Sequence, residues 1–85
     1  MFEVLWVKEA ELDLAKTWLN AKDRNDITRA AHRIETALRS APLKLGESRS
    51  GKDRILFDRP LGVTYRVRRR ARQVLILGVW RVGKA

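Results

Sequence analysis

The sequence predicts an α+β domain spanning residues 1–85, in which a helical hairpin packs on one face of a mostly antiparallel, four-stranded sheet (β-α-α-β-β-β). Two observations support this prediction. Apolar residues recur at helical spacing in the first half of the chain, whereas the second half contains short apolar runs separated by turn residues. If both helices and the apolar strand residues pack together, the other sheet face, which is rich in arginine, is left open.

The first half opens with a strand at residues 2–7, because Phe-Glu-Val-Leu-Trp-Val is rich in strand formers and too short for a helix. Residues 9–20 are strong helix formers, and the acidic residues in their first turn oppose the helix dipole. We expect this first helix to bury an apolar stripe made of Leu12, Ala15, Trp18 and Leu19.

A second helix is expected after a polar break at residues 22–24, with Asn25 or Asp26 as its N-cap. Pro42 ends this helix, because proline excludes the helical conformation for the residue before it. The apolar residues between these limits have a period close to 3.6. Those expected to face the sheet are Ile27, Ala31, Ile34 and Leu38.

The second half is expected to contain a loop and three strands. Residues 43–52 carry two glycines and two serines among mixed charges, which is typical of a loop. The strands are expected at residues 54–57, 61–68 and 74–82, joined by connections short enough for hairpins. The middle strand alternates apolar residues with glycine, threonine and arginine, so that one face is apolar and the other basic. The last strand is apolar on both faces and should lie inside the sheet.

Size and composition exclude several classes of protein. With 85 residues, 45% of them hydrophobic, the chain can build one small core. The absence of cysteine excludes disulfides, thiolate metal sites and cysteine nucleophiles. The N-terminal segment has no basic start, and its apolar stretch is too short for a signal peptide or a membrane span. We therefore expect a cytoplasmic protein without a membrane partner.

Positive charge is concentrated in the second half of the chain. Residues 1–42 hold seven Lys or Arg and seven Asp or Glu, whereas residues 43–85 hold twelve and three, which accounts for the whole net charge of +9. Arginine, at thirteen residues against six lysines, favours forked contacts to phosphate or carboxylate. The expected partner is an anion, either a nucleic acid or an acidic protein.

Three segments, in this order, resemble the RelE/ParE superfamily, the toxins of bacterial toxin–antitoxin pairs: FEVLWV before an acidic helix, RILFDRPLGVTYRV, and VLILGVWRV. The resemblance covers essentially the full length. It implies the α+β fold predicted above and a cognate antitoxin that wraps and neutralises the toxin. It also implies one of two activities. RelE-like members cleave mRNA on the ribosome, whereas ParE-like members inhibit DNA gyrase without RNA chemistry.

For a RelE-like nuclease, the resemblance assigns phosphate-holding residues. Lys52 and Arg54 match the basic pair of the family's second strand, and Arg81 or Lys84 stands where the family has a closing arginine. Gly62 replaces the arginine of the third strand, so a guanidinium would have to come from Arg59 or Arg66. The final tyrosine or histidine of the family has no counterpart in the sequence.

The sequence contains few candidates for a general acid or a general base. Glu47 is the candidate general base; the alternative is a solvated loop acid pairing with Arg49 or Lys44. Tyr65 alternates in phase with apolar neighbours, which favours a core tyrosine over a catalytic acid. The single histidine, His32, is expected on the surface of the second helix and cannot form a metal site alone. We expect neither a metal nor a cofactor.

The tryptophans Trp6, Trp18 and Trp80 are expected to be core anchors, with a base-stacking position as the alternative for Trp80.

Arginines are densest around the hairpin that joins the last two strands. Three interpretations stay open: an RNA-binding surface, a solvated turn that discourages edge-to-edge pairing, and a docking surface for an acidic antitoxin segment. In the RNA-binding interpretation, the residues that bind RNA are Lys52, Arg59, Arg66 and Arg68. The residues that serve catalysis are Arg54, Arg81 and Glu47. The leading hypothesis is thus a RelE-like mRNA interferase. The alternative is a non-enzymatic ParE-like gyrase inhibitor, or a degenerate module that only binds its antitoxin.

Overall fold

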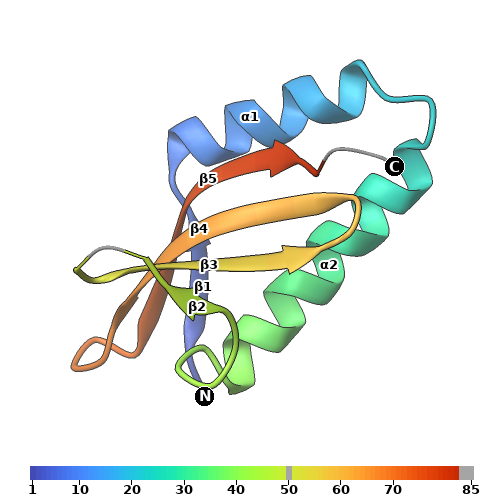
Figure 1. The fold of residues 1–85 in the computed structure, drawn as a ribbon. Helices are drawn as coiled ribbons and strands as arrows, with labels where there is room; N and C mark the ends of the chain where they lie inside the picture. Colours follow the sequence, from blue (N-terminus) through green and yellow to red (C-terminus); the bar gives the residue numbers. More distant parts are fainter. Residues whose placement is uncertain (50, 83–85) are drawn as a thin grey trace.

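A computed structural model describes residues 1–49 and 51–82. The elements in chain order are β1 (Glu3–Trp6), α1 (Lys8–Leu19), α2 (Arg24–Ser40), β2 (Glu47–Ser48), β3 (Asp53–Asp58), β4 (Leu61–Arg68) and β5 (Gln73–Arg81). Within these ranges the strands form one sheet in the order β1-β5-β4-β3-β2. β1 pairs with β5 in parallel, and the other pairs are antiparallel. The predicted α+β fold is confirmed (Figure 1).

The sheet has five strands where the sequence predicts four. The additional strand, β2, lies in the segment expected to be a loop and pairs Glu47 with Ile55 and Ser48 with Arg54. Gly46 precedes it with φ +68°, a left-handed conformation that glycine adopts without steric cost. This turn brings the two residues alongside β3. The pairing of β2 with β3 depends on this turn. Glu47 and Ser48 show no alternation of apolar and polar residues that would predict a strand from the sequence.

Helix α2 packs as its periodicity predicts. Ile27, Ile34 and Leu38 are fully buried, and Ala31 is half-buried. The helix begins at Arg24, so neither of the expected N-cap residues caps it; the N-cap position belongs to Asp23. It ends at Ser40, two residues before Pro42, in agreement with the proline stop.

Helix α1 turns a different face to the core than the sequence predicts. The expected stripe is exposed, with Leu12 at 51%, Trp18 at 38% and Leu19 at 62% of full exposure. Ala10 is buried instead, and Leu14 packs against the core beside it. Only Val7 separates α1 from β1, so the register of β1 against β5 fixes the rotation of the helix. Trp18 is therefore not a core anchor.

The two faces of β4 differ as predicted. Leu61, Val63 and Tyr65 are fully buried under the helices, whereas Arg66 is exposed on the other face. β5 lies between β1 and β4, which confirms it as an interior strand. In Figure 1, α2 runs behind β3 and β4, and α1 lies along β5. The sheet thus has one covered face and one open face.

None of the helices in the described part of the chain is both long and apolar enough to span a membrane.

Candidate nucleic-acid interface

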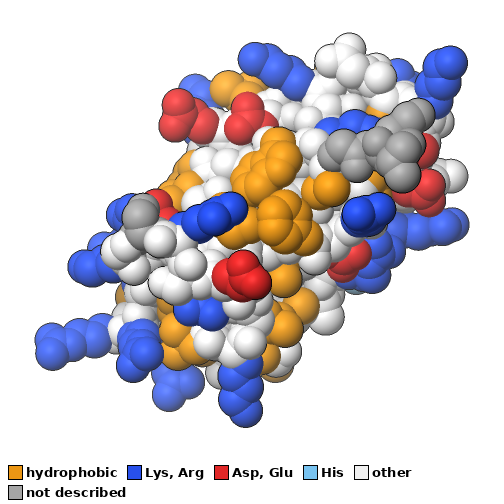
Figure 2. Space-filling view, in the orientation of Figure 1, with side chains coloured by type: hydrophobic (Ala, Val, Ile, Leu, Met, Phe, Trp, Pro, Cys, Tyr) orange, Lys and Arg blue, Asp and Glu red, His pale blue; other side chains and the backbone are white. Residues whose placement is uncertain are grey.

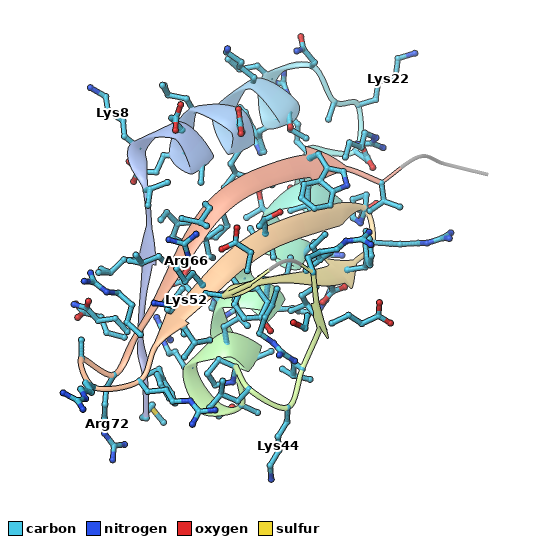
Figure 3. All side chains as sticks on the ribbon, turned by 60° about the vertical axis from the view of Figure 1, so that its left-hand side comes forward. Lys8, Lys22, Lys44, Lys52, Arg66 and Arg72 are labelled. Atoms are coloured by element: carbon cyan, nitrogen blue, oxygen red, sulfur yellow. The ribbon has the colours of Figure 1, made fainter. Side chains whose placement is uncertain are left out.

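Five cationic residues gather where the β4–β5 hairpin meets the turn before β3. Together with Val67, Ala71 and Leu75 they line an open depression of about 710 Å³. We call these five the hairpin cluster: Lys52, Arg66, Arg68, Arg69 and Arg70. Figure 3 shows Lys52 and Arg66 close together, and Figure 2 shows Lys and Arg side chains extending into solvent at this end of the molecule. The cluster contains three of the four residues predicted to bind RNA.

Strand pairing positions the cluster. Asp53 and Arg66 are register partners in β3 and β4, and the Arg66 guanidinium donates to the Asp53 carboxylate at 2.7–2.8 Å. This pair holds Lys52, the residue before Asp53, beside β4. Arg68 is paired with Gln73 at the last step of the β4–β5 ladder, and Arg69 and Arg70 follow in the turn.

The cluster is distinguished by the number of cations without counterions that lie together in it. Arg66 has Asp53, but within residues 1–49 and 51–82 no acidic side chain pairs with Lys52, Arg68, Arg69 or Arg70. Like charges this close repel one another until an anion approaches. A chain of phosphates relieves that repulsion at several positions together, so the surface is suited to a nucleic-acid backbone.

Two arginines of α2 are paired with acidic side chains instead. Arg33 bridges to Asp58 at 2.8 Å and Arg39 to Glu35 at 2.9 Å. The side-chain hydrogen bond that Arg33 donates to Asp58 raises the pKa of Arg33 above its ordinary value. These guanidinium groups tie α2 to the sheet or to itself. The charges of Arg33 and Arg39 are therefore neutralised internally.

Arg54, the leading catalytic candidate, is bound to backbone. Its guanidinium donates to the Leu45 carbonyl at 2.9 and 3.3 Å, to the Gly46 carbonyl at 3.3 Å, and from Nε to the Tyr65 hydroxyl at 3.3 Å. The Tyr65 hydroxyl lies 2.8 Å from the carbonyl oxygens of both Pro42 and Leu45. Arg54 and Tyr65 thus fasten residues 42–46 to the sheet, and Tyr65 is a core residue, as its alternation predicts.

Arg81 lies at the far end of β5 and binds Asp23 at 2.8 Å. The side-chain hydrogen bond that Arg81 donates to Asp23 raises the pKa of Arg81 above its ordinary value. Arg54 is paired with Tyr65, and Tyr65 with Ile76; Arg81 is five residues further along β5, about 16 Å away at the rise of a strand. The two arginines do not converge on one phosphate.

Glu47 is also apart from Arg54. It is exposed on β2 and pairs with Ile55, the neighbour of Arg54. Successive side chains point to opposite sheet faces, so Glu47 and Arg54 project in opposite directions. The structure consequently places the three catalytic candidates at three separate positions.

Arg59, the fourth predicted RNA-binding residue, is exposed in the β3–β4 turn. It lines a depression with Asp26, Arg29 and Arg33, and its carbonyl accepts a hydrogen bond from Arg33 at 3.2 Å. β4 has eight residues, which places this turn about 16 Å from Arg66 and about 23 Å from Arg68 at the rise of a strand. Lys84 lies outside the described residues.

The remaining candidates do not form a metal site. His32 is exposed on α2, as predicted, and no group of three His, Cys, Asp or Glu side chains in the described ranges could hold a metal ion.

Trp80 lies on the open sheet face and not in the core where it was expected, and it is paired there with Phe57, which the sequence analysis did not single out. The rings of Phe57 and Trp80 meet edge to face, with centroids 6.1 Å apart. Gly62 lies beneath them: a Cβ at this position would come within 2.8 Å of the Trp80 ring. A glycine inside a strand often marks such a close approach, and it is the one sequence signal for the pair. Figure 2 shows apolar side chains in the middle of this face.

The fold is shared with solved toxin–antitoxin proteins. A chain of the RelBE2 toxin–antitoxin complex of Mycobacterium tuberculosis is 20% identical, with a TM-score of 0.79 over 98% of this chain and 93% of that one. A chain of the chromosomal ParDE system of P. aeruginosa is 20% identical, with a TM-score of 0.72 over 98% of each chain.

The isolated RelE toxin of E. coli is 12% identical, with a TM-score of 0.69 over 100% of this chain and 88% of that one. No protein-family model matches the sequence, and no curated protein is similar to it at the sequence level. These superpositions, each over nearly the whole of this chain, show that the chain has the RelE/ParE fold.

Proposed function

We propose that this chain is the toxin of a bacterial toxin–antitoxin pair and that it inhibits translation by binding mRNA at the ribosome through the hairpin cluster. The fold supports the toxin role, since it is shared with RelE and ParE proteins. The observation that carries the RNA target is the group of cations without counterions at one end of the sheet. The proposed antitoxin partner and the cytoplasmic location follow from the same role.

The cluster gives the proposal a measurable property. Neutralising phosphates releases counterions, and for single strands log K falls with log[salt] with a slope of about −0.7 per phosphate contact. Four unpaired cations therefore predict a slope of about −3. An acidic antitoxin segment docked on the same cations would compete with RNA, which is a direct route to neutralisation.

Messenger RNA cleavage is the more specific form of the proposal. Attack by a 2′-hydroxyl needs a base, an acid and cations for the charge on phosphorus. Arg54, Arg81 and Glu47 are the candidates, and their separation means that positioning and charge stabilisation would have to supply most of the rate.

The separation of Arg54, Arg81 and Glu47 also favours a second function. Arg54 binds backbone carbonyls and Arg81 binds Asp23, so the described residues do not include an assembled acid–base site. This arrangement suits a non-enzymatic toxin of the ParE type, for which the resemblance implies DNA gyrase as the target. The two functions differ in what happens to mRNA and to DNA topology.

The test is to induce matched variants in bacterial cells. Lys52→Ala/Arg68→Ala removes two charges from the cluster, and Lys8→Ala/Arg29→Ala removes two exposed charges elsewhere. Growth, mRNA ends and plasmid supercoiling are measured for each. The proposal expects wild type and control to arrest translation and the cluster variant to lose that effect. Cleaved ribosome-bound mRNA identifies an interferase.

Two outcomes contradict the proposal. Altered supercoiling with intact translation would establish the gyrase function in its place. Equal growth arrest by the cluster variant and the control would show that the hairpin cations do not contact the target.

A further inference from the structure

A bulge in β5 decides which face of the sheet Trp80 occupies. The register of β5 against β4 passes from Ile76 to Gly78 within one step of β4, so Leu77 is an extra residue on β5. Ile76 and Val79 are both buried as a result, although residues three apart on a regular strand point to opposite faces. Without the extra residue, Trp80 would share the buried face of Ile76. Bulges of this kind re-aim a side chain and are frequent beside functional sites.

The re-aimed indole forms an exposed pair with Phe57. Phe57 is 55% exposed, and Trp80 is half-buried. The two ring planes stand at 85° to each other, so each ring covers little of the other and aromatic surface stays open to water. Neighbouring apolar side chains that stay exposed in this way mark a contact with another molecule.

The open face is low between this aromatic pair and the hairpin cluster. Thr64 and Gly78 are register partners there, and a Cβ added to Gly78 would meet no atom within 4 Å. Gly62, beneath the rings, and Arg66 are four residues apart on the same face of β4, which is about 13 Å at the rise of a strand. At the roughly 3.4 Å per nucleotide of one strand of a duplex, this distance corresponds to about four nucleotides.

Acidic side chains on this face do not obstruct that path. Asp53 is paired with Arg66, and Glu3 accepts a hydrogen bond from Gln73. Glu47 is on β2, two strands and about 10 Å from β4. Figure 2 shows lysine or arginine side chains on both sides of the apolar centre of the face. The open face therefore combines exposed aromatic rings with cations.

This combination fits a single strand of nucleic acid, for which cations follow the backbone and unpaired bases stack on aromatic rings. Stacking on aromatic side chains is also a common way in which proteins recognise the bases of single-stranded RNA. We propose that Trp80 and Phe57 bind an unpaired base of the RNA strand whose phosphates the hairpin cluster holds. This contact adds base recognition to the RNA binding proposed above, on which it depends.

The test compares the affinity for a short single-stranded RNA with that for its abasic counterpart, which has the same phosphates but no bases. Stacking of one base strengthens binding about 5- to 150-fold, so wild type should prefer the RNA by a factor in this range. Trp80→Leu should lose most of this preference and keep the wild-type affinity for the abasic strand. Trp18→Leu is the matched control: its indole is 38% exposed on α1, away from the sheet face, and its removal should leave the preference unchanged.

Fluorescence gives a second readout, because a base that stacks on an indole quenches its emission. The RNA should quench wild type and Trp18→Leu, whereas the abasic strand should quench neither. In Trp80→Leu the quenching should be lost. Phe57→Leu changes a more exposed ring and should weaken the preference for RNA in the same direction, which keeps the test decisive if Trp80→Leu does not fold.

Two results would overturn the base contact while leaving RNA binding by the cluster intact. One is equal, salt-dependent affinity of wild type for the RNA and the abasic strand. The other is an unchanged preference for RNA in folded Trp80→Leu or in Phe57→Leu. A wild type that binds neither strand would contradict the proposed RNA binding itself, and the base contact with it.

Discussion

The Tyr65 hydroxyl is expected to hold residues 42–46 against the sheet, and Tyr65→Phe tests this directly. The ring is fully buried and keeps its packing in the variant. What is lost is a hydroxyl 2.8 Å from the Pro42 and Leu45 carbonyls and 3.3 Å from Arg54 Nε. Leaving a buried polar group without its partner costs about 1–3 kcal/mol.

For a domain of this size, each kcal/mol lowers Tm by roughly 4–8 °C, so we expect a decrease of roughly 5–20 °C in thermal unfolding. Thr64→Val is the matched control, because it removes a hydroxyl from the adjacent residue on the other sheet face. It should change stability by less than about 0.5 kcal/mol. Equal stability of Tyr65→Phe and wild type would refute the role given to the hydroxyl.

The remaining predictions concern the core and the two arginines. Ile34→Ala should lower the free energy of unfolding by roughly 2–5 kcal/mol in urea titration, because it opens a cavity under the sheet; an effect below about 1 kcal/mol would contradict the packing. Arg54→Ala and Tyr65→Phe should be coupled by about 0.5–3 kcal/mol in a double-mutant cycle, since they share the Leu45 carbonyl; additive effects would separate them. Arg81→Ala should lower Tm less than Tyr65→Phe does, because its pair with Asp23 is at the surface.

Periodic packing is the part of this fold that the sequence predicts well. The α2 stripe and the alternation in β4 each follow from which residues must leave water, and the structure buries Ile34, Leu38, Val63 and Tyr65 accordingly. These patterns are local and long enough to have a single best solution.

Features that depend on distant contacts were not predictable in the same way. Helix α1 has apolar residues on more than one face, and only the pairing of β1 with β5 decides that Ala10 and Leu14 turn inward. The β2 pairing has no pattern of its own.

The candidate site was only partly predicted, because it also depends on contacts between distant residues. A cluster of arginines in one hairpin is visible in the sequence, and the structure keeps Lys52, Arg66 and Arg68 together. The partners of these arginines cannot be read from the sequence. Asp23 and Arg81 are 58 residues apart, and Arg54 binds backbone carbonyls, which every residue has. Whether an arginine is available to a ligand is decided by these long-range partners.

The most direct test of the central proposal is RNA affinity as a function of salt. Binding of a single-stranded RNA by wild type is expected to weaken with added salt at a slope of about −3 in log K against log[salt]. Lys52→Ala/Arg68→Ala should reduce the slope by about 1.4, whereas Lys8→Ala/Arg29→Ala should leave it unchanged. A wild-type affinity that does not vary with salt, or an equal slope in all three proteins, would contradict RNA binding by the hairpin cluster.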